Sequence, residues 1–273
     1  MKKILILTFA LVMTFGAAVL FTAAANGAET ARESIAKVAE TFDASEPIYQ
    51  KLNTLIAEEI AGFDSEDESD YNVDESKTAI KELDGYGEQL RDMLSGLSGL
   101  SDSPDTSDGK TVRAAREYLT MLQNMTADLS ELIDYSVKLY EAVLPMESMY
   151  AETDDYEELA DQIWNSTETV RGLLENIKPP SYLSITHGDL IARVTEFRDF
   201  ALDFYIANQL GDPLRTYSCM YRMNRIVRMF DICNENLNAD LELQIRQADH
   251  RMSGIISTIH DELTSNLAKL KNA

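Results

Sequence analysis

The sequence predicts an all-α protein, an elongated antiparallel bundle of about five to six helices with one very long C-terminal helix. Three observations favour this class. Apolar residues recur at helical spacing through long segments, and the alternating runs typical of strands are nearly absent. Helix-breaking residues are also sparse, with six Pro and twelve Gly in 273 residues, and they fall between the periodic segments.

The chain begins with a segment typical of a secretory signal. Lys2 and Lys3 precede a long apolar stretch, and small residues surround Ala25. We expect residues 1–28 to be a cleaved signal peptide. An uncleaved membrane anchor is the alternative, because the stretch approaches the ~20 residues that span a bilayer. Both readings predict an extracytoplasmic protein of a prokaryote, secreted or in the cell envelope, with a helical-bundle domain at 29–273.

The first two helices are separated by an acidic run. The first is expected at about 29–63, where Pro47 either kinks it or marks a new start capped by Ser45. The second is expected at about 74–98. A stretch rich in Gly, Ser, Pro and Asp follows at 95–109 and predicts a loop.

The next two helices are long and end at proline. The third is expected at about 110–144, with apolar residues every three or four positions, and Pro145 ends it. The fourth is expected at about 150–177 and stops at the Lys-Pro-Pro sequence that follows. These breaks suggest an N-terminal helical pair at 29–98 and a C-terminal part at 110–273.

The fifth helix is expected at about 186–210, where Thr186 and Asp189 form a start that resembles a capping box. The Gly-Asp-Pro sequence at 211–213 then supplies three signals in a row. Gly211 is a C-terminal stop, Asp212 is an N-cap, and Pro213 is suited to the first helical position.

The segment 214–273 contains no Pro and is the most regular in the chain. Its apolar residues recur on average about every 3.6 positions, which predicts one helix of about 58 residues, roughly 87 Å long. Gly254 is the one weak point. The positions on this apolar stripe are Cys219, Met223, Ile226, Phe230, Cys233, Leu237, Leu241, Ile245, Ala248, Met252, Ile255, Ile259, Leu263, Leu267 and Leu270.

Both cysteines fall on this stripe. Cys219 and Cys233 are fourteen residues apart, about 21 Å along a helix, whereas a disulfide needs Cα atoms within roughly 7 Å. We therefore expect core packing. A Cu(I) site shared with Met223 and Met229 is one alternative, because thiolate and thioether suit that ion, and an intermolecular disulfide is another.

Four arginines stand out in a chain of net charge −23. Arg222, Arg225 and Arg228 step round the final helix, and Arg215 precedes them. Pairing with carboxylates on neighbouring helices is the expected role. The alternative is a patch that binds an anion or a protein, and these four residues are the interaction candidates that the sequence supplies.

The acidic run 64–75 fits the ligand spacing of an EF-hand calcium loop. The position that needs Gly holds Ser69, however, and Glu occupies two positions that favour shorter side chains. We expect a solvated loop, with divalent-cation binding as the alternative.

The sequence from Ile177 to Leu190, Ile-Lys-Pro-Pro-Ser-Tyr-Leu-Ser-Ile-Thr-His-Gly-Asp-Leu, resembles the Pro-Pro turn before a His-bearing helix in the cytochrome b562 family. The resemblance covers about fourteen residues and implies His187 as a haem ligand. That family takes its second ligand from a Met on the first helix, and the segment 29–63 contains none. Sequence position favours an exposed or cap-adjacent His187.

Functional expectations follow from charge and from motifs. A strong polyanion repels nucleic acid, so a nucleic-acid partner is not expected. We find no catalytic motif, so we expect a non-enzymatic protein with no cofactor. It would act by protein–protein contact, self-association or ligand binding, and touch a membrane only through an uncleaved N-terminus. A carrier of a divalent cation or haem is the alternative, and an unrecognised hydrolase or lyase is the third reading.

Overall fold

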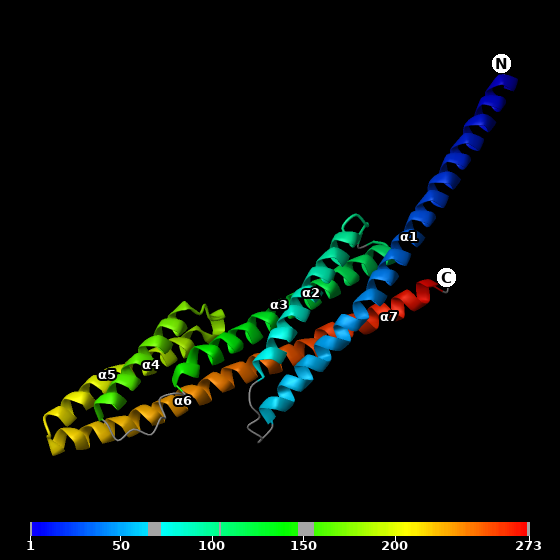
Figure 1. Cartoon of the computed structure of the whole chain (residues 1–273). Coiled ribbons are helices and arrows are strands. Elements are labelled where there is room, and N and C mark those ends of the chain that lie inside the picture. The colour runs from blue at the N-terminus through cyan, green and yellow to red at the C-terminus, as the bar shows by residue number, and fades with distance from the viewer. Residues whose placement is uncertain (1, 65–71, 104, 147–155, 272–273) are drawn as a thin grey trace. The chain divides into compact units, whose positions relative to one another are not determined.

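The structure is a computed structural model that describes the backbone of residues 2–64, 72–103, 105–146 and 156–271, and the side chains of 32–63, 72–103, 105–146 and 157–270. Within these ranges the chain is helical and contains no strand, which confirms the all-α prediction (Figure 1). Among the residues with described side chains, no helix is long and apolar enough to cross a membrane. The predicted signal segment 1–28 lies outside the described side chains.

Seven α-helices are found in the described ranges, and their bounds agree with the predicted ones to within a few residues except at the start of α1. The predicted start of the fourth helix at about 150 lies outside the described residues. The α-helices are α1 (Lys2–Asp64), α2 (Val73–Leu97), α3 (Ser107–Val143), α4 (Tyr156–Asn176), α5 (Ser184–Gln209), α6 (Pro213–Arg251) and α7 (Ser257–Lys271). A 3-10 turn, η2 (Ser181–Leu183), precedes α5, and a π-helical turn, η3 (Met252–Ile256), joins α6 to α7. The predicted C-terminal helix is therefore continuous from Pro213 to Lys271.

The chain divides into two compact units, and each is made of separate segments. Unit 1 comprises residues 1–53, 86–124 and 251–273, and unit 2 comprises 54–85 and 125–250. Several long helices therefore contribute one part to each unit.

Unit 1 buries an aromatic cluster around His260. The imidazole of His260 on α7 stacks on the ring of Tyr49 on α1, with centroids 4.6 Å apart. Its Nε2 lies 2.7 Å from a carboxylate oxygen of Glu46. Burial alone would raise the pKa of Glu46, but hydrogen bonds from Gln50 and His260, with the His260 charge, lower it overall.

Helix α1 runs through Pro47 without a new start. Ser45 is buried and is not an N-cap, because its hydroxyl donates to the carbonyl of Phe42 at 2.7 Å. The capped-restart alternative is therefore wrong. A side-chain bond of this kind gives a buried hydroxyl a partner inside the helix.

The π-helical turn η3 changes which residue of the C-terminal helix is buried. Ile256 is 2% exposed, whereas Ile255, which the regular stripe places in the core, is 58% exposed. Ile256 follows the buried Met252 by four residues, so the two side chains lie on the same face of the helix at this turn. The predicted core position Ile255 is therefore wrong, and downstream Leu263 and Leu267 are buried as expected.

The loop between α2 and α3 is held tightly against the first turns of α3. The Arg116 guanidinium donates to the carbonyls of Leu97, Ser98 and Leu100 and pairs with Asp102 at 2.9 Å. These charge-assisted bonds fix the loop from several directions. At its end the Thr106 hydroxyl caps α3 by accepting from the backbone N–H of Gly109 at 3.1 Å.

Gly109 is the residue that permits this close approach. A Cβ at Gly109 would lie within 2.9 Å of three backbone atoms of Ser103. We expect Gly109→Ala to lower the free energy of unfolding by about 2 kcal/mol, because the loop backbone must move. Urea titration followed by far-UV circular dichroism measures this value.

Gly172 on α4 is the matched control, because a Cβ there meets nothing within 4 Å. Gly172→Ala should raise the stability by about 0.5–1 kcal/mol through helix propensity. The two substitutions are thus predicted to act with opposite signs. A Gly109→Ala protein as stable as the parent would contradict the packing described for this loop.

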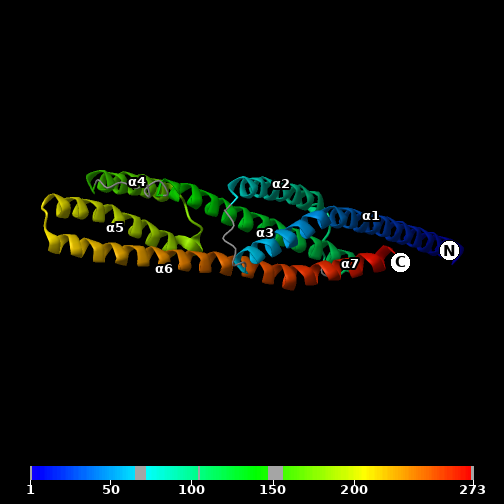
Figure 2. The ribbon, with the colours of Figure 1, turned by 60° about the horizontal axis from the view of Figure 1, so that its bottom comes forward.

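Unit 2 packs α4, α5 and α6 along one another (Figures 1 and 2). Their shared core cluster consists of Ile163, Phe197, Phe200, Ala201, Ala207, Cys219 and Ile226. On the surface, Glu168 of α4 accepts hydrogen bonds from Arg171 and from Arg198 of α5. These bonds hold the pKa of the Glu168 carboxyl at about 2.

The turn between α5 and α6 forms as predicted. Gly211 has φ of 58°, a conformation that favours glycine at a helix end. The Asp212 carboxylate accepts from the backbone N–H groups of Leu214 and Arg215, at 3.0 and 3.3 Å. Pro213 opens α6. These contacts confirm the predicted stop, N-cap and first helical residue.

The predicted capping box at the start of α5 is wrong. The helix begins at Ser184, and the residue before it makes no side-chain cap. Thr186 instead donates its hydroxyl hydrogen to the carboxylate of Asp240 on α6. The Thr186 hydroxyl, which the local sequence predicts as a helix cap, therefore hydrogen-bonds to a residue on another helix.

Candidate functional site

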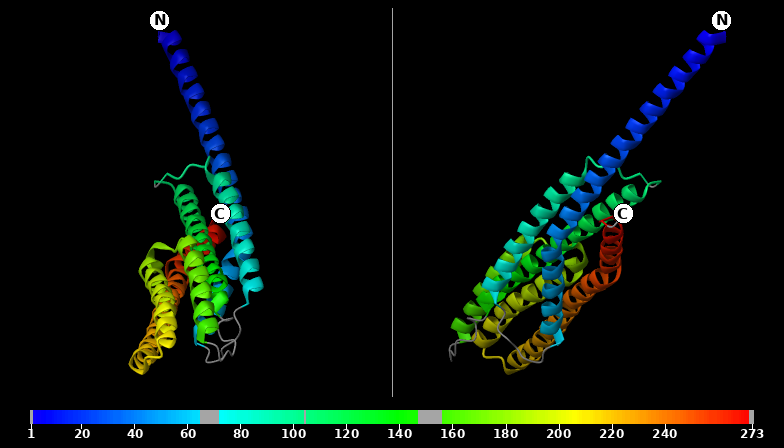
Figure 3. Two further views of the ribbon diagram at one scale, coloured as in Figure 1. Left: turned by 60° about the vertical axis from the view of Figure 1, so that its left-hand side comes forward. Right: turned by 90° about the vertical axis from the view of Figure 1, so that its right-hand side faces the viewer.

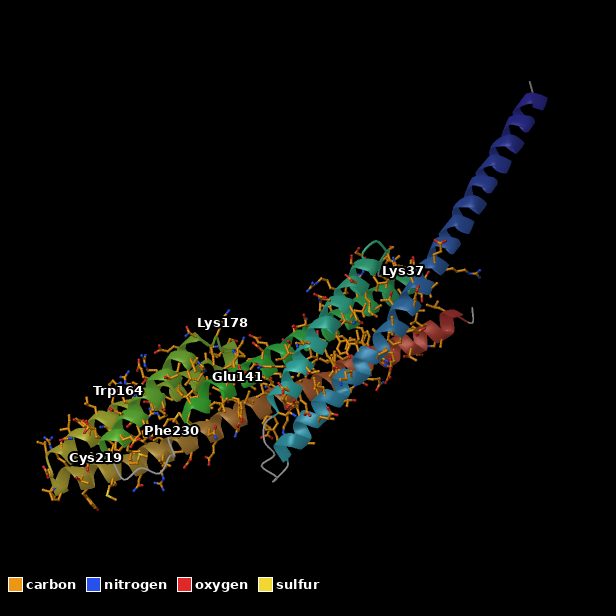
Figure 4. All side chains as sticks on the ribbon, in the orientation of Figure 1. Lys37, Glu141, Trp164, Lys178, Cys219 and Phe230 are labelled. Atoms are coloured by element: carbon orange, nitrogen blue, oxygen red, sulfur yellow. The ribbon has the colours of Figure 1, made fainter. Side chains whose placement is uncertain are left out.

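The end of the α5–α6 hairpin exposes a large amount of apolar surface. We call residues 202–228 the α5–α6 tip, and Figure 4 shows Cys219 near this end of unit 2. Its exposed apolar side chains are Leu202, Ile206, Leu210, Leu214, Tyr217, Met220, Tyr221 and Val227. Single exposed apolar residues are ordinary on a protein surface, but a group on two adjoining helices is typical of an interaction site.

Three of the exposed apolar side chains of α6 share one face. Leu214, Tyr217 and Tyr221 are spaced by three and four residues, so they lie one above another along the helix. They are 82%, 73% and 72% exposed. The opposite face carries Cys219 and Ile226, both buried in the unit 2 core. This part of α6 is therefore apolar on both sides, and only one side is covered.

A packed core supports the tip from beneath. Phe200 and Phe204 of α5 stack with centroids 5.7 Å apart, and Phe197 meets Phe230 of α6 edge-on at 6.1 Å. Figure 3 shows α5 and α6 side by side in both of its views. Packed aromatic pairs restrict side-chain motion, so the exposed face is presented on a rigid base.

The four predicted interaction residues all lie on the α6 half of the tip. Arg222 pairs with Asp203 of α5, and Arg225 pairs with Glu196 of α5. The expected pairing with a neighbouring helix therefore holds for these two. Arg215 lies 3.9 Å from Asp212, and Arg228 is exposed and has no ion pair with any described residue.

Sequence reasoning found the arginines and missed the apolar face beside them. The signal was available, because Leu214, Tyr217 and Tyr221 lie off the regular stripe of the C-terminal helix. A second apolar row on an otherwise polar face is the mark of a helix with two contacts. Exposure itself depends on which neighbours cover the row, and sequence alone does not show them.

The two cysteines are buried free thiols. Cys219 is packed in the core cluster, and Cys233 lies 4.0 Å from the carbonyl of Thr186. Burial raises the pKa of both thiols, with a smaller effect from nearby aspartates. Neutral, buried thiols are poor nucleophiles, so their role is the predicted one of core packing.

His187 is buried, and its predicted exposed position is wrong. It is 4% exposed, and both ring nitrogens have partners. Nε2 lies 3.0 Å from the carbonyl of Leu174 and Nδ1 lies 3.1 Å from the hydroxyl of Tyr135. A carbonyl only accepts, so Nε2 carries the hydrogen, and in the neutral ring Nδ1 accepts from Tyr135. Burial raises the pKa of Tyr135 to about 12, which keeps this donor protonated.

This arrangement does not suit the haem role implied by the cytochrome b562 resemblance. An axial ligand needs a ring nitrogen with a free lone pair directed at the iron. In His187 one nitrogen donates to Leu174 and the other accepts from Tyr135. The packing around His187 makes it a link between α3, α4 and α5.

A cavity of about 230 Å³ lies in unit 2 at the side of α6. It is lined by Val143, Met146, Leu190, Phe230, Asp231, Cys233, Asn234 and Leu237. Sites that enclose drug-sized ligands are usually about 300–1,000 Å³ and combine apolar walls with converging polar groups. This cavity is smaller, and its polar lining is limited to neighbouring residues of one helix.

Most of the acidic run 64–75 lies outside the described residues, so the cation alternative stays a prediction. Its end is described: the Asn72 side chain accepts from the backbone N–H of Glu75 at 3.2 Å and caps α2. Among the side chains that the structure describes, no group of three or more His, Cys, Asp or Glu residues is placed to hold a metal ion.

Comparison with known proteins gives no match to a protein-family model, to a curated protein or to a solved structure.

Proposed function

We propose that the chain is a secreted or envelope-associated helical-bundle protein that acts by protein–protein contact, with the α5–α6 tip as the contact surface. The observation that carries this proposal is the set of eight exposed apolar side chains on the tip. Leaving so many apolar groups in water costs free energy, and covering them with a partner recovers it. The proposal assigns no catalytic residue and no cofactor.

The composition of the tip supports a protein partner. Tyr, Met and Arg are enriched in protein–protein interfaces, and Tyr and Arg are prominent among the residues that dominate binding energy. The tip exposes Tyr217, Tyr221, Met220 and Arg228 close together in sequence on α6. The N-terminal segment 1–28 supports the extracytoplasmic location, because its pattern is that of an export signal.

Site-specific photocrosslinking tests the proposal in the native host. A photoreactive phenylalanine analogue at Tyr217 should give a discrete adduct of defined mass after irradiation. The control position is Tyr182 in η2, an exposed tyrosine of the same unit outside the tip. Adducts of equal yield from Tyr217 and Tyr182, or no adduct from Tyr217, would overturn the proposal.

A matched pair of substitutions separates the tip from general surface apolarity. Leu214 and Ile185 are 82% and 80% exposed, and only Leu214 belongs to the tip. Leu214→Ser should reduce the yield of the Tyr217 adduct by at least about fivefold, since hot-spot truncations cost ~1 kcal/mol or more. Ile185→Ser should leave that yield unchanged.

A further inference from the structure

We infer that the α5–α6 tip binds an acidic amphipathic helix of a partner protein. This inference rests on the proposed function and adds the chemical class of the partner. It is carried by three properties of the tip: its charge, the shape of its exposed apolar row, and the incomplete neutralisation of its arginines.

The tip is a basic island on a strongly acidic chain. Residues 202–228 hold four Arg and two Asp, a net charge of +2, whereas the whole chain has a net charge of −23. Opposite charge steers association and opposes unsuitable partners. A partner segment rich in Asp and Glu is therefore attracted to the tip and repelled by most of the remaining surface.

The arginines of the tip keep unused capacity for carboxylates. Glu196 is shared between Arg193 and Arg225, so one negative charge serves two cations. Arg225 and Arg215 are about 60% exposed. Arg228 has no ion pair with a described residue. Guanidinium groups bind carboxylates in a bidentate manner, which gives direction as well as affinity.

The apolar row has the dimensions of a helix-binding surface. Leu214 and Tyr221 are seven residues apart, about 10 Å along α6. Arg225 and Arg228 continue the same side of the helix by one to two further turns. A partner helix with apolar residues at i, i+3 or i+4, and i+7 can pack on the row and place its acidic side chains beside the arginines.

A second copy of the chain and an anionic membrane fit the tip less well. Two identical tips would bring like charges together. A bilayer would have to accept the turn at Asp212, whose carboxylate is fixed as the N-cap of α6. Self-association predicts a doubled mass in light scattering, and a membrane partner predicts binding to phosphatidylglycerol vesicles.

The experiment uses the full-length protein and synthetic helical peptides. The probe has apolar residues in a seven-residue repeat and Glu at its outer positions, and a second peptide has the same apolar residues with Lys in place of Glu. Fluorescence anisotropy of the labelled peptides should give at least about tenfold tighter binding of the acidic peptide. Added salt should weaken that binding, because exposed charges are screened.

Variants locate the binding. Arg228→Glu should weaken binding of the acidic peptide by about tenfold, and Lys178→Glu, which reverses an exposed charge outside the tip, should not (Figure 4). Tyr217→Ser should weaken the binding of both peptides. Circular dichroism and thermal melts check that each variant keeps its fold.

Several results would overturn the inference. Two of them concern the peptides: the acidic peptide does not bind at about 1 mM, or both peptides bind equally. The third is binding to phosphatidylglycerol vesicles in place of the peptide. The fourth is a doubled mass in light scattering that Tyr217→Glu abolishes. Equal peptide binding would leave the proposed contact function in place. Failure of the Tyr217 crosslink would remove that function directly.

Discussion

Replacement of His187 by Ala is expected to lower the free energy of unfolding by about 3–5 kcal/mol. The substitution removes a buried aromatic ring and leaves a cavity between α3, α4 and α5. It also removes the hydrogen bonds of the ring to the Tyr135 hydroxyl and the Leu174 carbonyl. The Tyr135 hydroxyl then stays buried without this acceptor, whereas the Leu174 carbonyl still accepts from the backbone N–H of Ile177 at 3.0 Å. Equilibrium unfolding in urea, followed by circular dichroism, measures the loss.

His250 provides the control, because it is exposed on α6 and makes no described hydrogen bond. His250→Ala should change stability by less than about 0.5 kcal/mol. Tyr135→Phe tests the hydrogen bond alone, because it keeps the ring and removes the donor, and should cost about 1 kcal/mol. Similar values for His187→Ala and His250→Ala would show that His187 does not link the helices as described.

Ile256→Ala is expected to cost about 3 kcal/mol, because the side chain is 2% exposed in the core of unit 1. Ile255→Ala should cost less than about 0.5 kcal/mol, since its side chain is 58% exposed. The two neighbours have the same side chain, so composition and helix propensity cancel in the comparison. Urea unfolding of both variants gives the two values.

This pair also tests the π-helical turn itself. The regular apolar stripe of the sequence places Ile255 in the core. The described turn η3 buries Ile256 instead. A larger loss for Ile255→Ala than for Ile256→Ala would therefore contradict η3.

The helices and several of their ends follow from local sequence. The Gly-Asp-Pro turn at 211–213 formed as predicted, because φ above zero, an N-cap carboxylate and a fixed proline ring each act within a few residues. The two cysteines likewise lie in the core because helical spacing places them on the apolar face. Such features depend on neighbours in sequence.

The sequence-based predictions are wrong where contacts with residues far along the chain determine the local structure. Thr186 could cap its own helix, but Asp240 of α6 takes its hydroxyl. His187 is polar and close to a helix start, yet Tyr135 and Leu174 satisfy both ring nitrogens and allow burial. The π turn at 252–256 adds a residue that average periodicity cannot reveal.

The candidate site was predicted only in part. Arg215, Arg222, Arg225 and Arg228 were recognisable from the contrast with an acidic chain. The apolar row beside them was not recognised, because Leu and Tyr at helical spacing ordinarily indicate core. Whether such a row is covered depends on how many neighbouring helices surround α6, and that number is a property of the folded chain.

The segmented make-up of unit 1 has a consequence for biosynthesis. Residues 251–273 belong to the same unit as residues 1–53, and His260 on α7 packs against α1. The ribosome synthesises residues 1–53 first and residues 251–273 last, whereas it completes every segment of unit 2 before it reaches residue 251. Tyr118 of α3 can cover part of the apolar face of nascent α1, but the part that packs on His260 stays uncovered until α7 emerges. Premature termination near residue 250 would remove a wall of the unit 1 core.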